Sequence, residues 1–158
     1  MTLPALELFD AGLPIQEIFG LPVHPLVIHG AVVLLPLAAA GYLWMFSSVK
    51  RSARLGGAVS FVAVLGAVFA FLSMASGRDL RAALGMGPRQ HFDLGGWLPW
   101  FGLALAVLTV LLYLMDRKAK GARSVPGVIV GFVGVVVAVI TIGWTIYTGH
   151  TGAELVWG

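Results

Sequence analysis

The 158-residue chain contains no cysteine. Disulfide bonds, thiolate metal sites and iron–sulfur clusters held by cysteine are therefore excluded. Charged residues are scarce as well, because they make up 11% of the chain while 59% of the residues are hydrophobic. Soluble domains carry roughly 25% charged residues. This composition predicts a membrane protein whose first partner is the lipid bilayer.

Four apolar runs are long enough to cross a bilayer, which takes about 20 residues in a helix. They predict an all-α fold, an up-and-down transmembrane four-helix bundle that forms a single membrane domain over residues 1–158. The runs are apolar on every face, unlike the alternating strands of a membrane barrel. Residues 1–21 form short amphipathic pieces that we expect at the membrane interface. The predicted helices span about 25–47, 55–76, 92–115 and 125–148.

Ionisable residues are missing from the expected membrane core. Every acidic residue and every lysine and arginine lies toward or beyond the ends of the four runs. Ion-coupled transporters usually keep such a residue near the midplane, so this absence argues against coupled transport. Two serines, Ser73 and Ser76, lack the nucleophile-elbow pattern of a hydrolase. Transport and hydrolysis are therefore disfavoured.

Basic residues are sorted between the connections. Seven of the ten fall in the first and third connections, and both tails have none. By the positive-inside rule these two connections are cytoplasmic, which places both termini outside the cytoplasm. A nucleic-acid-binding surface would need the basic residues on one soluble face, together with side chains that contact the bases. The sequence shows neither, so nucleic acid is not an expected partner.

All four histidines fall at the predicted outer leaflet. His24 and His29 open the first helix, His91 opens the third, and His150 closes the fourth. Pro25 suits the first helical position, which makes His24 the N-cap and leaves His29 about one turn deeper. We therefore expect His29 to matter more than His24 for a bound cofactor. The alternative for each histidine is an interfacial side chain that binds only headgroups and water.

Glycines accompany two of these histidines. Gly95 shares a helical face with His91, and Gly143 shares one with His150. Small residues on a ligand's own face leave room for a flat, wide group. Small residues also line ordinary membrane helix contacts. The glycine face from Gly127 to Gly134 predicts such a contact, either within the bundle or in a homo-oligomer.

Imidazoles from two helices commonly hold haem iron inside a bundle. Diagonal helices lie about 12 to 14 Å apart, a gap that suits two imidazoles with a porphyrin iron between them. His29 with His91 is the first expected pair, and His24 with His150 forms a second pair or a supporting shell. One or two haem b groups are thus expected, with Arg78, Arg81 and Arg89 near the propionates or, alternatively, binding solvent or lipid phosphate.

Two other readings use the same residues. A bare zinc or copper ion would need three or four of the histidines around one point. The chain could also be a cofactor-free subunit of a membrane complex. Of these three, we expect haem, in an electron carrier more than in an enzyme that turns over a substrate.

The run "LPVHPLVIHGAVVLLPLA" and the closing "TGHTGAELVWG" carry a family resemblance. They resemble a family of small bacterial membrane proteins designated domain of unknown function 2231, with an HPxxxH opening and a glycine-rich closing motif. The resemblance implies a four-helix protein of the bacterial cytoplasmic (inner) membrane. Some members are fused to Rieske-type domains, which implies electron transfer with a separate partner here, such as a Rieske-type or cytochrome protein. The matching residues are His24, Pro25, His29, Gly149, His150, Gly152, Ala153 and Glu154.

Overall fold

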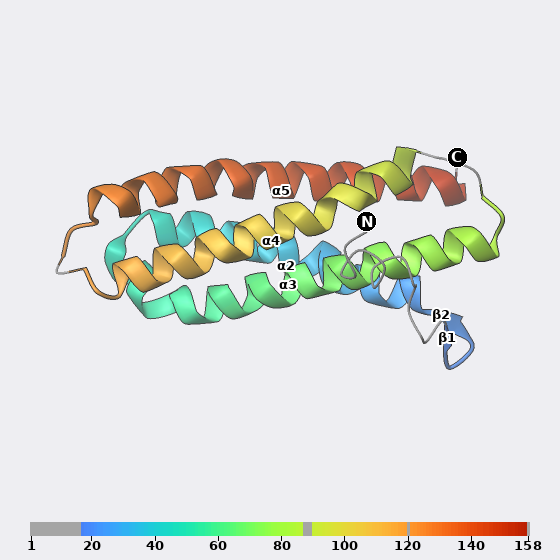
Figure 1. Ribbon diagram of the computed structural model, residues 1–158, viewed down its shortest axis with the longest axis horizontal. Coiled ribbons are helices and arrows are strands. Elements are labelled where there is room, and N and C mark those ends of the chain that lie inside the picture. Colours follow the sequence, from blue (N-terminus) through green and yellow to red (C-terminus); the bar gives the residue numbers. More distant parts are fainter. Residues whose placement is uncertain (1–16, 87–89, 120, 158) are drawn as a thin grey trace, which may run out of the picture.

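The computed structural model describes residues 17–86, 90–119 and 121–157. Over these residues four long helices run side by side (Figure 1). Each is long and apolar enough to cross a membrane, which confirms the expected all-α, four-helix membrane fold. The helices are α2 (Val23–Phe46), α3 (Val49–Ala83), α4 (Gln90–Asp116) and α5 (Val125–Trp157), and α2 is preceded by strands β1 (Glu17–Ile18) and β2 (Leu21–Pro22).

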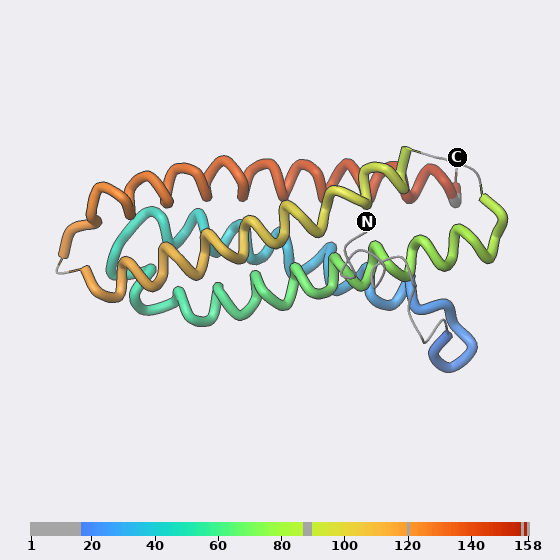
Figure 2. Tube along the Cα trace, in the orientation of Figure 1, coloured from blue at the N-terminus to red at the C-terminus, as the bar shows by residue number. Residues whose placement is uncertain are grey.

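Consecutive helices run in opposite directions, so the bundle is up-and-down. Figure 2 shows the α2–α3 and α4–α5 connections at one end and the C-terminus at the other. Each helix packs against its neighbours in the chain, and α5 closes the ring against α2. Helices α2 and α4 touch only slightly, which makes them a diagonal pair. We call the end where α2 and α4 begin the histidine end, and the opposite one the basic end.

Two helices extend well past the apolar runs that predicted them. Helix α3 covers 35 residues instead of about 55–76, and α5 continues to Trp157 instead of ending near 148. At 1.5 Å per residue, α3 is about 52 Å long, whereas the hydrocarbon core is about 30 Å thick. Hydropathy reports only the part of a helix inside that core. The backbone hydrogen bonds continue beyond it, so the true ends lie further out.

A small hairpin precedes α2. Ile18 pairs with Leu21, and the two turn residues, Phe19 (φ 54°) and Gly20 (φ 75°), both have positive φ. Positive φ at both central positions is typical of the tight turns that suit the strand twist. The hairpin covers the last part of the interfacial segment predicted for residues 1–21. The rest of that segment, residues 1–16, lies outside the described residues.

Glycines of α5 receive large side chains from α2. Gly134 lies against the Tyr42 ring, so closely that an added Cβ would overlap the ring. The Tyr42 hydroxyl donates to the Val130 carbonyl oxygen at 2.8 Å. Phe46 covers Gly131 in the same manner. The glycine face predicted on the fourth helix is therefore used inside the bundle, where missing side chains admit two aromatic rings.

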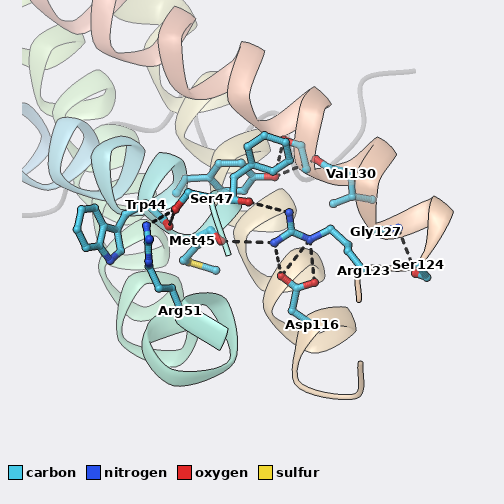
Figure 3. A network of polar contacts seen from close by, with 12 residues as sticks. Trp44, Met45, Ser47, Arg51, Asp116, Arg123, Ser124, Gly127 and Val130 are labelled. Carbon is cyan, nitrogen blue, oxygen red and sulfur yellow. Dashed lines mark hydrogen bonds and ion pairs between the residues drawn. The ribbon is translucent and has the colours of Figure 1, made fainter. Parts of the chain in front are cut away.

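A buried ion pair at the basic end links the ends of α2 and α4 to the segment just before α5 (Figure 3). Arg123, just before α5, donates to the Asp116 carboxylate of α4 at 2.6 Å and 2.9 Å. The same guanidinium donates to the Phe46 carbonyl oxygen at 2.8 Å, at the C-terminal end of α2. The Asp116 side chain is only 1% exposed. Arg123 thus satisfies a carbonyl that the end of α2 leaves unpaired, and ties it to α4.

Candidate functional site

The four histidines lie at one end of the bundle but point in different directions. His24 of α2 and His91 of α4 are partly buried, whereas His29 and His150 are exposed. Helix α2 begins at Val23, with Pro22 as its N-cap. The expected role of His24 as an N-cap is therefore wrong. His24 lies in the first helical turn, and its ring reaches α3.

The His24 ring is held by the end of α3. Its Nδ1 lies 3.0 Å from the Ser73 carbonyl oxygen and 3.2 Å from Ser76 Oγ. Gly77 lets the ring approach, because a Cβ added there would lie 3.0 Å from His24 Cε1. A carbonyl oxygen can only accept, so Nδ1 must carry the proton. This hydrogen bond fixes both the tautomer and the orientation of the ring.

The His91 ring is held in the same way by α5. Its Nδ1 lies 3.0 Å from the Thr148 carbonyl oxygen and 3.5 Å from Thr151 Oγ1. A Cβ added at Gly152 would lie 2.9 Å from His91 Cε1. The three partners again occupy positions i, i+3 and i+4, as Ser73, Ser76 and Gly77 do on α3. We call the two arrangements the His24 clamp and the His91 clamp.

Both clamps leave the second ring nitrogen available. Within the described residues, neither Nε2 has a hydrogen-bond partner, while each Nδ1 donates to a backbone carbonyl oxygen. With the proton on Nδ1, Nε2 carries a lone pair. A histidine that donates one N–H to a carbonyl and offers the other nitrogen is the usual form of a metal-ligating imidazole. The clamps therefore hold two imidazoles from diagonal helices in fixed orientations.

Two cavities meet at these rings. One, of about 390 Å³, is lined by residues of all four helices, including both histidines, Leu80, Arg81 and Leu155. We call it the central cavity, and its lining is mainly apolar. The other, of about 430 Å³, opens between α3 and α4 and again includes both histidines. Both imidazoles therefore line each of the two cavities.

His29 and His150 line neither cavity. His29 is exposed, and its Nδ1 bonds the Pro25 carbonyl oxygen of its own helix. The His150 side chain is 66% exposed, with Nε2 3.3 Å from Glu154 Oε1. The structure thus brings His24, and not the His29 of the expected first pair, to the cavities that His91 also lines. His24 and His29 are five positions apart on α2, so their side chains leave the helix on different faces.

The other predicted site residues separate in a similar way. Arg78 and Gly95 line the cavity between α3 and α4, whereas Arg81 lines both cavities. Gly95 leaves open space, since an added Cβ would meet nothing within 4 Å. Gly143 is exposed and faces outward with His150, so it leaves no room for a group near the cavities. Arg89 lies outside the described residues.

The arrangement suits a cofactor that takes two imidazoles. Within residues 17–86, 90–119 and 121–157, no three side chains of the ligating types cluster tightly enough to share a metal ion. A bare zinc ion usually takes four ligands, three of them from the protein even in a catalytic site. Haem needs only two axial ligands, since its porphyrin supplies the rest. Two clamped imidazoles therefore match the number of protein ligands that haem takes, whereas a bare ion would need at least one more.

Comparison with known proteins identifies a family for this chain. The model of the family described as "Predicted membrane protein (DUF2231)" matches residues 20–158. The match covers all four helices and both clamps. No curated protein and no solved structure matches the chain.

Proposed function

Since the chain belongs to the DUF2231 family of predicted membrane proteins, we propose that it binds haem b through His24 and His91 and carries electrons near the outer face of the cytoplasmic membrane. The single observation that supports this most is the pair of clamps. Each fixes an imidazole by its Nδ1–H, leaves Nε2 without a partner in the described residues, and lies at the wall of the central cavity. Bound haem would supply reversible one-electron chemistry.

The residues of the chain have separate tasks in this site. His24 and His91 would hold the iron by Nε2, and the carbonyl oxygens of Ser73 and Thr148 raise the basicity of the rings by accepting from Nδ1. Leu80 and Leu155 give the central cavity apolar walls, which would contact the porphyrin. Arg81 lines both cavities and donates its Nε–H to the Met86 carbonyl oxygen, so its remaining N–H groups would donate charge-assisted hydrogen bonds to propionates.

Orientation and partners complete the proposal. The basic end carries Lys50, Arg51 and Arg54 in the first turns of α3 and Arg117, Lys118 and Arg123 in the α4–α5 connection. The positive-inside rule places that end in the cytoplasm and the histidine end outside. The chain holds no iron–sulfur cluster ligands, since it has no cysteine. Electrons would therefore pass to or from a separate redox protein, of the Rieske or cytochrome type, outside the bacterial cytoplasmic membrane.

A visible spectrum tests the haem directly. The wild-type protein, expressed in cells supplied with haem and purified in detergent, is expected to show a sharp Soret and alpha band on reduction. Metal analysis of the same sample provides the comparison. Stoichiometric zinc or copper without haem bands would replace the proposal by metal handling, and neither cofactor would point to a cofactor-free subunit.

A reporter fusion tests the orientation. A reporter that is active only in the cytoplasm, fused after Gly158, is expected to be silent, because the basic end of the bundle stays inside. The same reporter placed in the α2–α3 connection at Ser48 should be active. Strong activity of the C-terminal fusion would reverse the orientation and bring the histidine end to the inner leaflet.

Substitution of Gly152 tests the clamp without touching a ligand. In Gly152→Ala the new Cβ would lie 2.9 Å from His91 Cε1, so the ring must move. Loss of an outer partner of a ligating histidine typically costs 10- to 100-fold in affinity, and we expect a similar loss of haem. Gly143→Ala is the matched control on α5, because its Cβ meets nothing within 4 Å. Equal haem content in the two variants would contradict the clamp.

A further inference from the structure

The basic end of the bundle carries positive charge that no exposed acidic side chain balances. Asp116 is the one acidic residue of the described chain at this end, and it is buried against Arg123. The other acidic residues of the described chain lie toward the histidine end. Such a surface attracts anions, and the nearest anions at the end of a membrane bundle are lipid headgroups. Its exposed cations in the described residues are Lys50, Arg51, Arg54, Arg117 and Lys118.

Tyr113 of α4 brings two polar groups to the contact between α3 and α4 at this end. Its ring packs on Gly56 of α3, where an added Cβ would overlap the ring. Its hydroxyl oxygen would lie 3.5 Å from a Cβ added at Gly57. The Arg117 guanidinium lies over the same ring, 5.4 Å from the centroid. The α3–α4 seam therefore presents a hydroxyl and a guanidinium beside one another.

The cations continue the helix faces that form this seam further along the bundle. Residues seven apart in a helix lie within about 20° of one another, because seven steps of 100° make almost two turns. Lys50, Gly57 and Val64 therefore follow one face of α3. Arg117 keeps the helical hydrogen bonding of α4 and follows the same face as Val110. Val64 and Val110 both line an apolar groove of about 340 Å³.

The groove is lined only by apolar side chains of α3 and α4. Val64 and Val107 form its rim and are each about half exposed, whereas Ala67 and Ala106 are almost fully buried on its floor. Small alanines between larger side chains create a furrow that suits one hydrocarbon chain. The groove alone fits many apolar chains. The cations at its basic end favour a chain that carries an anionic head.

The length of the seam matches one leaflet. Leu103 lies at the far end of the groove, about 21 Å from Arg117 at 1.5 Å per residue. A bilayer with its headgroups is about 40 to 45 Å thick, so one leaflet takes about half of that. A lipid whose phosphate lies beside Arg117 would therefore reach the far end of the groove with its acyl chain.

We propose that the α3–α4 seam binds an anionic phospholipid at the basic end, with its phosphate held by Lys50, Tyr113 and Arg117 and one acyl chain in the groove. Phosphate oxygens accept hydrogen bonds from the ammonium, hydroxyl and guanidinium groups of these side chains. A headgroup with its own cation, such as choline, would gain less from the basic surface. The site shares no residue with the proposed haem site and does not require that haem be bound.

The test is a titration with dioleoylphosphatidylglycerol. The protein is purified in detergent, and bound lipid is counted by native mass spectrometry. A saturable site is expected, and dioleoylphosphatidylcholine, with the same chains and no net charge, should bind it about ten-fold more weakly. Glycerol 3-phosphate, which has the phosphate without the chains, should not bind at these concentrations. Absence of a saturable site, equal binding of the two lipids, or binding of glycerol 3-phosphate as tight as that of the lipid would overturn the proposal.

Two arginines provide matched variants for the headgroup. Arg117 and Arg51 are both exposed at the basic end and both lie over an aromatic ring, but Arg51 lies over Trp44 of α2. Arg117→Gln should bind phosphatidylglycerol about five-fold more weakly, and Arg117→Gln with Lys50→Gln about 30-fold. Arg51→Gln lowers the net charge equally and should bind like wild type. Equal weakening in Arg117→Gln and Arg51→Gln would reduce the effect to general attraction by the basic end and overturn the site.

A second pair of variants tests the acyl chain. Val107→Phe fills the groove from its rim, and lost contact with about two methylene groups makes binding about ten-fold weaker. Val133→Phe places the same ring on α5, at a residue of similar exposure that does not line the groove. It should bind like wild type, and far-ultraviolet circular dichroism shows that each variant keeps its helices. Equal affinity of the two variants would remove the groove from the site and overturn the proposal.

Discussion

Replacing His24 or His91 by alanine is expected to remove nearly all haem from the purified protein. Each substitution deletes one of the two imidazoles that would hold the iron, whereas loss of an outer partner alone already costs roughly 10- to 100-fold in affinity. Reduced-minus-oxidised spectra, scaled to protein concentration, measure the effect. From the sequence, His29 was expected to matter more for haem than His24, because it lies deeper along the helix. The structure reverses this expectation, because His24 lines the cavities and His29 does not.

His29→Ala is the matched control for this prediction. It removes an imidazole five positions further along the same helix, and its ring is exposed and bonds its own backbone. His150→Ala serves the same purpose on α5. Both variants should keep the wild-type spectrum. Haem that survives in His24→Ala but is lost in His29→Ala would restore the pairing expected from the sequence and reject the clamps.

The membrane fold could be predicted from composition because length and hydropathy are enough to identify a spanning helix. Runs of about 20 apolar residues, with basic residues in alternate connections, determine the number of helices and their order. The lengths of α3 and α5 could not be predicted in this way. Residues 149–157 are less apolar than the run before them, yet α5 continues through them to Trp157. Hydropathy does not distinguish a helix that leaves the membrane from one that ends there.

The direction of each histidine could not be predicted either, for a related reason. A helix that is apolar on every face has no polar stripe to indicate which side faces the bundle. Depth along the chain therefore favoured His29, while the rotation that buries His24 is set by packing of α2 on α3. A usable signal was present in the partner helices. Serine or threonine recurs at i and i+3 with glycine at i+4 in Ser73, Ser76 and Gly77 and in Thr148, Thr151 and Gly152.

The buried ion pair between Asp116 and Arg123 could not be predicted from the sequence either. Both residues fall in a connection rich in basic side chains, where solvation is the ordinary expectation for each. The structure instead buries the carboxylate and turns the guanidinium toward the end of α2. Their partner on α2, the Phe46 carbonyl oxygen, is a backbone atom 77 positions away from Arg123. A main-chain carbonyl oxygen is present at every residue, so the spacing of side-chain types in the sequence cannot identify this acceptor.

Replacing Arg123 by methionine is expected to destabilise the bundle strongly. The change leaves the Asp116 carboxylate, 1% exposed, without its cation, and breaking a buried pair on one side costs about 3–5 kcal/mol. It also frees the Phe46 carbonyl oxygen at the end of α2. Unfolding by a denaturing detergent, followed by far-ultraviolet circular dichroism, measures the loss.

Two further variants show whether the unpaired charge is the cause. Arg51→Met removes an exposed arginine at the same end, which bonds Ser47 and stacks on Trp44, so its cost should be small. The double variant Asp116→Leu with Arg123→Met removes both charges and should recover much of the lost stability, because apolar replacement of a buried pair is often neutral. A double variant as unstable as Arg123→Met would shift the cause to the lost bond at the Phe46 carbonyl. If Arg123→Met is no less stable than Arg51→Met, the ion pair does not hold the basic end together.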